Sequence, residues 1–341
     1  MEKLTPPNNE DDIKSYWKYT DKVYISCICI AYNHELYIKD SLDSILAQIS
    51  EYRFEIIIHD DLSTDKTRDI LLEYKNKFPN IIKLILQKEN QFSQGKKLIP
   101  IAASEAIGDY ICLCEGDDYW INKNKIQKQF EELEKNKNLN ICFTAAKGLN
   151  LSTNKYTLLS NHSKNNKYFT CSDIIRGGGD FMPTASIMLR KCVFENLPQW
   201  YLTAPVGDYF LQIYGASNGA LFLSNITSIY RVNSVGSWSA SQKKNDENKI
   251  VNFCSSMTHI LNSMRKDNIN NADIDYAISA QELIAAQQLI KKKSYKKAKE
   301  LIVTSWKRYP AISFKHNVMY YSRNFLSLIY LLFIIKFKYT Q

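Results

Sequence analysis

The sequence predicts an α/β protein with a mostly parallel central sheet, followed by an α-helical extension at its C-terminal end. Short apolar runs alternate with amphipathic stretches over residues 23–135, which is the pattern of strands joined by crossover helices. Two of these runs stop at acidic side chains: Asp60 and Asp61 end one, and the segment Glu115-Gly-Asp-Asp118 ends the other. Because ligands bind at the carboxyl ends of the strands in open α/β sheets, both acidic groups are expected to line one site.

The expected elements follow one another in a regular order. Strands are expected over 23–30, 54–59, 81–86 and 110–114, and helices opening at 33–35 and then over 65–76, 99–106 and 124–135. The first helix has an apolar face formed by Ile38, Leu42, Ile45 and Leu46. A polar loop over 149–167, a strand over 184–189, a helix over 207–215 and closing strands over 220–223 and 227–232 come next. From residue 248 onward the pattern is helical, with an antiparallel pair over 274–291 and 295–306.

Length and composition limit the organisation of the chain. Its 341 residues, 45% of them hydrophobic, suffice for one large domain with an appendage. We expect a polar N-terminal segment over 1–22, poorly ordered over 1–20, a main domain over 23–240 and a helical extension over 241–341. No apolar run opens the chain, so no signal peptide is expected.

The eight cysteines do not suggest a zinc site. Two pairs, Cys27 with Cys29 and Cys112 with Cys114, are separated by a single residue on expected strands, whereas structural zinc sites prefer two to four intervening residues in a loop. Buried reduced thiols in a cytosolic protein are expected instead.

The segment Glu115–Asp118 has the composition of a divalent metal site. Gly116 allows the backbone to turn sharply at the end of the strand, and the aromatic pair Tyr119–Trp120 follows at once. Carboxylates packed this closely repel one another and call for a counter-charge, for which Mg²⁺ or Mn²⁺ is suited because both take oxygen ligands. A metal beside a diphosphate would neutralise a phosphate leaving group. The pair Asp60–Asp61, taken alone, equally suits a helix cap or a solvated turn.

Together these segments resemble the family 2 glycosyltransferases, which bind nucleotide sugars with the GT-A fold. The resemblance covers about residues 23–240 and rests on Ile30–Gln48, Glu55–Thr67, Asn90–Gly95, Gly108–Tyr110, Glu115–Trp120 and Val206–Tyr209. It implies a GT-A sheet, where the alternation of elements alone fits a Rossmann-like sheet as well. It does not specify the sugar, because many bacterial capsule, lipopolysaccharide and glycan-assembly enzymes share these segments.

The resemblance implies nucleotide-binding roles for residues at the ends of the first strands. Ala31 and Tyr32 would contact the base, Glu35 and Asp61 would hold base or ribose edges with Asp60 beside them, and Lys97, next to Lys96, would lie near the phosphates. For Tyr32 the alternative is a packing aromatic, and for Lys97 it is a solvated charge.

The segment Glu115-x-Asp117 is this chain's form of the family's Asp-x-Asp motif. By resemblance, Asp117 is the predicted ligand of Mn²⁺ or Mg²⁺, with Glu115 in the first position of the motif. Asp118 would support the metal or contact the sugar. Trp120 would line the sugar pocket or, equally, pack in the core.

Asp208 is the predicted catalytic base. A sugar hydroxyl is a poor nucleophile until its proton is removed, and Asp208 would take that proton. The acceptor oxygen would then attack the anomeric carbon opposite the nucleoside diphosphate, so the resemblance implies inversion. A plain helix cap is the alternative for this residue.

One position departs from the family pattern. The segment Tyr230–Trp238 matches a family segment that often carries His where Asn233 stands, and Asn is a weaker, neutral ligand. Coordination of the metal by Asn233 is therefore open, although the reaction class is not. Arg231 is predicted to contact the diphosphate or, equally, to serve a structural role.

The C-terminal segment carries the basic excess of the chain. The net charge is +9, yet residues 291–341 alone hold 12 Lys or Arg and one acid, Glu300, so the remaining residues sum to −2. The uncharged run Phe325–Ile335 is too short to span a bilayer, which takes about 20 apolar residues, and with its basic flanks it suits a helix in the membrane interface. We therefore expect a cytoplasmic protein attached peripherally to the inner face of the membrane, or else a helix packed on the body.

These observations favour a glycosyltransferase over other classes. The expected partners are a nucleotide diphosphate sugar, commonly of uridine in this family, and a glycan or polyisoprenyl-linked glycan acceptor. The alternative is a non-catalytic GT-A-fold partner in a membrane-bound assembly complex, which only Asn233 supports. Nucleic acid is not an expected partner. The basic residues of the tail are interleaved with long aliphatic side chains rather than with aromatic residues on which bases could stack. A nucleotidyltransferase would usually have a Gly-rich loop after the first strand, and Ala31–His34 is not one.

Overall fold

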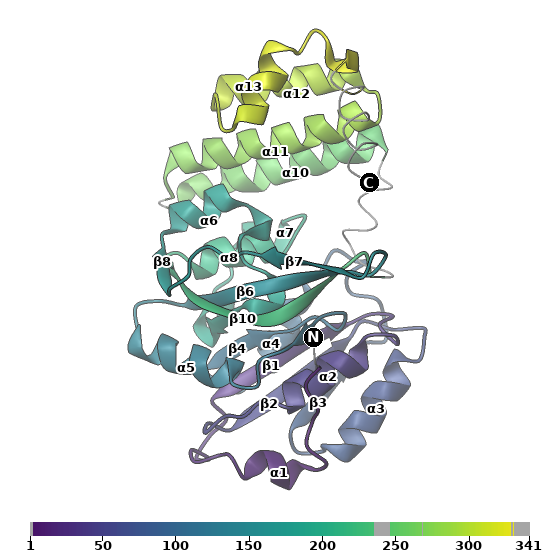
Figure 1. The fold of residues 1–341 in the computed structure, drawn as a ribbon, viewed down its shortest axis with the longest axis vertical. Coiled ribbons are helices and arrows are strands. Elements are labelled where there is room, and N and C mark those ends of the chain that lie inside the picture. Colours follow the sequence, from purple (N-terminus) through teal and green to yellow (C-terminus); the bar gives the residue numbers. More distant parts are fainter. Residues whose placement is uncertain (1–2, 235–245, 268, 329, 331–341) are drawn as a thin grey trace. The chain divides into compact units, whose positions relative to one another are not determined.

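The structure is a computed structural model that describes residues 3–234, 246–267, 269–328 and 330 (Figure 1). Contacts within the chain form two units. One unit comprises residues 1–202 and 207–240 and holds the sheet, and the other comprises residues 203–206 and 241–341 and holds the C-terminal helices. No helix in the described part of the chain is both long and apolar enough to cross a membrane.

One sheet organises the first unit. Its strands are β1 (Ile25–Ala31), β2 (Phe54–Asp60), β3 (Ile82–Leu86), β4 (Tyr110–Leu113), β5 (Tyr119–Trp120), β6 (Ile141–Asn150), β7 (Lys155–Leu159), β8 (Lys167–Phe169), β9 (Met188–Arg190) and β10 (Ala220–Val232). The order is β3-β2-β1-β4-β9-β6-β10-β5, with β7 paired to β6 and β8 to β10. The longest registers are parallel, β1 with β2 and β6 with β10, and β9 runs antiparallel between β4 and β6. The prediction of a mostly parallel sheet is confirmed.

The helices follow the predicted alternation. They are α1 (Glu10–Lys14), α2 (Ile38–Leu46), α3 (Thr67–Lys77), α4 (Leu98–Ser104), α5 (Lys125–Lys135), α6 (Cys171–Gly177), α7 (Gln199–Thr203) and α8 (Asp208–Gly215). The predicted apolar face of α2 is fully buried and packs in the core with the apolar side chains of β1 and β2. This packing holds α2 against β1 and β2.

The N-terminal segment is more ordered than expected. Helix α1 lies within it, Ile13 is buried in the core, and the Glu10 carboxylate accepts hydrogen bonds from the backbone N–H groups of Asn80 and Ile81 at 2.6 and 3.0 Å. The expectation of poor order is therefore wrong for this helix, because one apolar and one acidic side chain tie it to the start of β3.

Three predictions for the middle of the chain are wrong in detail. The expected loop over 149–167 instead contains the end of β6, the whole of β7 and the start of β8, with β6 and β7 paired antiparallel. The expected strand over 184–189 is a 3₁₀ turn, Thr184–Ser186, followed by β9. The two closing strands are one strand, β10, with register shifts between Leu223 and Ser228.

The second unit is helical, as predicted. Its helices are α10 (Glu247–Ser263), α11 (Asn271–Lys291), α12 (Tyr295–Arg308) and α13 (Phe314–Tyr321). Helices α11 and α12 pack along each other and form the predicted pair, joined by residues 292–294. Most of the predicted interfacial run over 325–335 lies outside the described residues.

Candidate functional site

The acidic turn Glu115–Asp118 forms where β4 leaves the sheet. The Cys114 N–H donates to the Ile28 carbonyl at 3.0 Å, and the Gly116 N–H donates to the Ile30 carbonyl at 2.8 Å, so the turn stays hydrogen-bonded to β1. A Cβ added at Gly116 would lie 2.6 Å from His34 Nδ1 and 3.1 Å from the Ile30 carbonyl oxygen. Glycine is needed here because two neighbouring groups approach the backbone closely.

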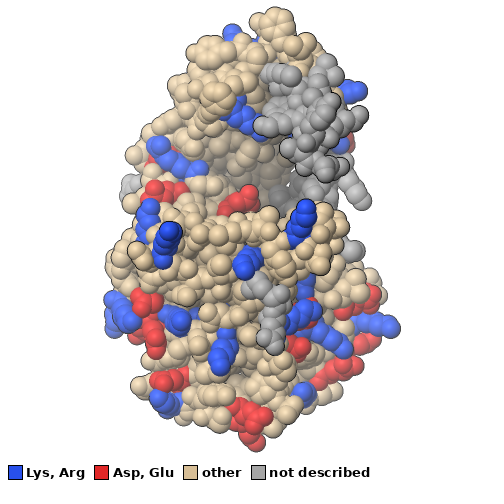
Figure 2. Space-filling model, viewed as in Figure 1, with Lys and Arg blue, Asp and Glu red and all other residues tan. Residues whose placement is uncertain are grey.

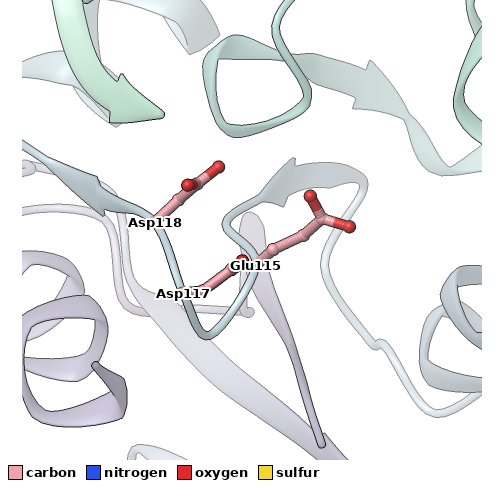
Figure 3. Close-up of side chains that lie close together, drawn as sticks. All are labelled: Glu115, Asp117 and Asp118. Carbon is pink, nitrogen blue, oxygen red and sulfur yellow. The ribbon is translucent and has the colours of Figure 1, made fainter. Parts of the chain in front are cut away.

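Three carboxylates of this turn share a small volume (Figure 3). Glu115, Asp117 and Asp118 each offer an oxygen within 4.8 Å of the others. Burial, reinforced by the charge of Asp117, raises the pKa of Glu115 to about 8 and raises that of Asp118 well above its usual range. The buried Oδ2 of Asp118 has no hydrogen-bond partner among the described residues. This uncompensated set of hard oxygen ligands fits a divalent cation such as Mg²⁺ or Mn²⁺.

The end of β10 holds the acidic turn in place. The Arg231 N–H donates to Asp118 Oδ1 at 2.9 Å, and the buried Arg231 guanidinium donates to the Asp117 carbonyl at 2.6 Å. The same guanidinium forms an ion pair with Asp40 and lies over the ring of Tyr119 at 4.5 Å. These contacts correspond to the structural alternative for Arg231. Its predicted contact with a diphosphate stays a prediction.

The residues that follow β10 also reach the turn. Ser234 is buried, and its hydroxyl donates to Asp117 Oδ2 at 2.6 Å. Asn233, the predicted third ligand, precedes it with a φ of 64°, in the left-handed region that Asn tolerates better than most residues. Neither Ser234 nor Asp40 was predicted as a site residue from the sequence, because no local pattern marks either one.

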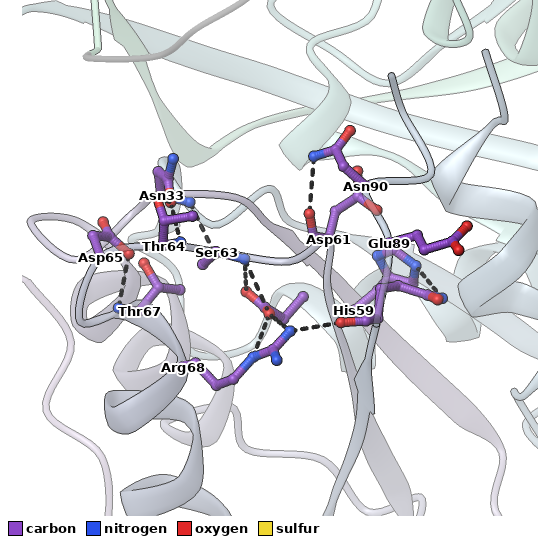
Figure 4. A network of polar contacts seen from close by, with 12 residues as sticks. Asn33, His59, Asp61, Ser63, Thr64, Asp65, Thr67, Arg68, Glu89 and Asn90 are labelled. Carbon is purple, nitrogen blue, oxygen red and sulfur yellow. Dashed lines mark hydrogen bonds and ion pairs between the residues drawn. The ribbon is translucent and has the colours of Figure 1, made fainter. Parts of the chain in front are cut away.

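The loop that follows β1 and the loop that follows β2 are joined by hydrogen bonds that run in both directions (Figure 4). The Asn33 N–H donates to the Ser63 hydroxyl at 2.9 Å, and the Asn33 side-chain oxygen accepts from the Thr64 N–H at 2.7 Å. The Glu35 N–H donates to Asp65 at 3.0 Å, while the Glu35 carboxylate accepts from the Lys66 N–H at 3.0 Å. The carboxyl ends of the first two strands therefore form one rigid edge.

The predicted nucleotide-binding acids on this edge have different surroundings. Asp60 is fully buried, and its Oδ2 accepts from Arg68 Nε at 2.8 Å and Nη2 at 2.5 Å. Asp61 is also fully buried, and its two oxygens accept the backbone N–H groups of Gln91 and Phe92 at 2.7 and 3.0 Å. Asp60 therefore anchors α3, and Asp61 holds the loop that leads to α4.

The apolar and aromatic residues predicted to contact the nucleotide sugar differ in their exposure to solvent. Ala31 is fully buried, and its carbonyl accepts the Asp61 N–H at 3.0 Å, whereas the side chain of Tyr32 is exposed. Trp120 is fully buried, donates from Nε1 to the Ala185 carbonyl at 2.8 Å, and carries the Lys125 ammonium 4.4 Å from its ring centroid. Its surroundings are those of a core residue, which is the packing alternative.

The predicted base and the predicted lysine lie near each other, since Lys97 Cδ is 3.7 Å from a Cβ built at Gly207, the residue before Asp208. Asp208 is the first residue of α8, and the residue as a whole is exposed. The surrounding protein nevertheless keeps water from its carboxylate, and this loss of hydration raises the pKa of the carboxyl above its ordinary value. Burial lowers the pKa of Lys97, and the charge of Asp208 opposes that shift. The charge of Asp208 also raises the pKa of Glu115, so Asp208 acts electrostatically on both groups. The buried hydroxyl of Tyr201 lies beside them, 3.6 Å from a Cβ built at Gly207.

Comparison with known sequences identifies the family. The family described as Glycosyl transferase family 2 matches residues 26–197, half of the chain. An uncharacterized protein of Mycobacterium tuberculosis is 30% identical over 218 residues, which are 63% of this chain and 60% of that protein. The dTDP-rhamnosyl transferase RfbG of Shigella flexneri is 37% identical over 103 residues, which are 29% of this chain and 35% of that protein. This chain thus spans less than two thirds of the length of either relative.

Comparison with solved structures identifies the fold. The structure of S. aureus TarS 1-349 in complex with UDP-GlcNAc matches with a TM-score of 0.64, covering 89% of this chain and 86% of that chain. At 17% identity this likeness is evidence for the fold alone, and it confirms the predicted GT-A fold. With the family match spanning half of its length, this chain belongs to glycosyl transferase family 2.

Proposed function

We propose that this protein is an inverting, metal-dependent glycosyltransferase that takes its sugar from a nucleotide diphosphate sugar, with uridine as the expected nucleoside. The acceptor is a hydroxyl of a glycan or lipid-linked glycan in surface polysaccharide biosynthesis. One observation carries the proposal: Glu115, Asp117 and Asp118 gather their carboxylates at the end of β4, and Asp208 is near enough for its charge to act on Glu115. Family membership supports the same reaction class.

The acidic turn is the place for the metal in this proposal. Glu115 and Asp117, with Asn233, would hold Mn²⁺ or Mg²⁺, which would supply positive charge to the diphosphate. Arg231 and Ser234 position Asp117 through its carbonyl and its Oδ2. Their contacts fix the direction of the carboxylate before any ligand arrives, so little reorganisation is needed on binding.

The edge formed by the first two strands is the place for the nucleoside. Tyr32 is exposed at the end of β1, where its ring is available to stack on a base. Glu35 uses Oε2 for the Lys66 N–H, and in this proposal its other oxygen accepts from the ribose or the base. Asp60 and Asp61 keep the edge rigid, because their carboxylates already hold Arg68 and the loop at Gln91.

Asp208 takes the proton of the acceptor hydroxyl as its oxygen attacks the anomeric carbon. The bond from that carbon to the diphosphate oxygen breaks on the opposite face, which inverts the configuration. Removal of the base should slow the reaction by roughly 10²- to 10⁴-fold. Lys97, near Asp208 and lowered in pKa by burial, is placed to contact a phosphate or the sugar.

Release of nucleoside diphosphate from a panel of UDP-, GDP- and dTDP-sugars tests this proposal without knowledge of the acceptor. We expect release from one donor with Mn²⁺ or Mg²⁺, none with EDTA, and at least about 100-fold slower release from Asp208→Asn. Asp109→Asn is the matched control, because Asp109 is an exposed carboxylate that precedes β4, at the opposite end of that strand from Glu115. Absence of release from every donor, together with absence of metal-dependent nucleotide binding, would favour the non-catalytic assembly partner.

A membrane location follows from the acceptor in this proposal. An acceptor carried on a polyisoprenyl lipid lies at the membrane surface, and the basic C-terminal segment suits peripheral attachment to the inner face.

A further inference from the structure

Helix α13 has two faces with different partners. Its inner face packs in the core of the helical unit, where Met319 and the following Leu326 are buried. His316, also fully buried, shares a hydrogen bond of 3.1 Å with the Ser305 hydroxyl on α12. Tyr320 stacks on Trp306 of α12 with ring centroids 4.1 Å apart. The inner face therefore fixes α13 to α12, and the orientation of the outer face follows from it.

The outer face of this segment is apolar and exposed. Its members are Phe314 (82% exposed), Val318 (42%) and Tyr321 (73%) in α13, and Phe325 (65%) and Leu328 (60%) after the turn that ends this helix. We call these five residues the α13 face. Three of the five most exposed large apolar side chains in the described part of the chain belong to it. Exposed large apolar side chains gathered in one short segment mark an interaction site more often than scattered single residues do.

The positive charge of the surrounding chain favours an anionic surface over a second copy of this chain as the partner of the α13 face. From residue 301 to residue 341 the sequence has six Lys or Arg and no Asp or Glu. Figure 2 shows a mostly uncharged surface over the described parts of α12 and α13, interrupted by scattered basic side chains. Two copies of this chain facing each other here would bring like charges together, which opposes self-association. An anionic surface is attracted to the same charges.

We propose that the α13 face binds the surface of an anionic phospholipid bilayer, with its aromatic and aliphatic side chains in the headgroup interface. This inference deepens the membrane attachment proposed above by naming the structured surface that makes it. In the sequence, an uncharged run begins at Phe325, within the α13 face, and ends at Ile335, and Arg323, Lys336 and Lys338 flank that run. An apolar face bordered by Lys and Arg is the composition of helices that lie in the interface.

Vesicle co-sedimentation of the purified full chain tests the proposal. The vesicles are pure phosphatidylcholine or contain about one quarter phosphatidylglycerol, so that neutral and anionic surfaces are compared. The test variant is Phe314→Ser/Tyr321→Ser/Phe325→Ser, which leaves every basic residue in place. Ile107→Ser is the matched control, because Ile107 is an equally exposed apolar residue of the other unit. Circular dichroism shows whether each variant keeps its helices.

We expect the wild type and Ile107→Ser to bind anionic vesicles in a salt-sensitive manner, and the triple variant to bind at least about tenfold more weakly. Unchanged binding by a folded triple variant would overturn the proposal. So would concentration-dependent dimerisation of the wild type, abolished by the same substitutions, without vesicle binding. Donor hydrolysis in the same preparations should be equal in all three proteins, so failure of the membrane proposal and failure of the glycosyl-transfer proposal give different results.

Discussion

Replacement of Gly116 by Ala tests how tightly the acidic turn is packed, without removing any of its carboxylates. Gly116 is not among the glycines with positive φ, so Ala can adopt its backbone conformation. Ala would by itself add about 0.4–1 kcal/mol of stability by restricting the unfolded chain. The added Cβ, however, would lie 2.6 Å from His34 Nδ1, 3.0 Å from Ile38 Cδ1 and 3.1 Å from the Ile30 carbonyl oxygen. Overpacking of this kind costs about 1–3 kcal/mol, and the three close contacts place Gly116 toward the upper end of that range, so a net loss of up to about 2.6 kcal/mol is expected.

Urea denaturation and metal titration measure the two consequences of Gly116→Ala. Relief of the clash shifts the turn away from Ile30, so Mn²⁺ affinity should fall together with the free energy of unfolding. Gly179→Ala is the control, since its Cβ would meet only Tyr209 Cβ at 3.6 Å, an ordinary contact. His34→Ala should restore much of the loss in the double variant, because the nearest clash is with that ring. A Gly116→Ala protein as stable as the wild type, or a loss that His34→Ala does not reduce, would refute the steric argument.

Two further substitutions test the ion pairs that support the sheet. Burial raises the pKa of Glu10, but hydrogen bonds from Lys14 and Asn80 bring it below its ordinary value, so its stabilisation is present above about pH 4.5 and disappears as the pH falls through the folded pKa. Glu10→Gln should therefore lower the free energy of unfolding by about 1–2 kcal/mol at pH 7 in urea titrations, and by less near pH 3. An equal loss at both pH values would show that the ionised carboxylate is not the source of the stabilisation. Arg68→Met leaves Asp60 buried without its counter-charge and should cost about 3 kcal/mol in the same assay, and Asp60→Asn in that background should recover part of it.

Local periodicity was enough to predict the half of the sheet in which strands alternate with helices. The buried face of α2 at Ile38, Leu42 and Ile45 follows directly from helical spacing, and the parallel order places the ends of β1, β2 and β4 at one edge. The same reasoning failed for β7, whose side chains are almost all exposed. A strand of that kind has no buried face, so its sequence shows no alternation of buried and exposed positions, and only pairing with β6 defines it.

The groups that hold the acidic turn could not be predicted for a different reason. The hydrogen bond from the Arg231 N–H to Asp118 joins residues 113 positions apart, and the one from Ser234 to Asp117 joins residues 117 apart. Such contacts depend on β10 returning to lie beside β5, which no local pattern specifies. The carboxylates and Arg231 could therefore be named from the sequence, but the contacts by which Arg231 and Ser234 orient the turn could not.

The two acidic motifs are alike in sequence but differ in how the protein compensates their charge. At the end of β2, Asp60 Oδ2 accepts two hydrogen bonds from Arg68, and Asp61 accepts two backbone N–H groups, so both carboxylates have partners within the fold. At the end of β4, one oxygen of Asp118 is buried without a partner among the described residues, and the pKa of Glu115 is raised to about 8 by burial and by its acidic neighbours. One buried oxygen of the acidic turn has no partner among the described residues, whereas both carboxylates at the end of β2 have theirs, so we expect a cation at the acidic turn. The decisive difference is the presence of compensating partners, and this is why the acidic turn after β4, rather than the Asp60–Asp61 pair, is the metal site in our proposal.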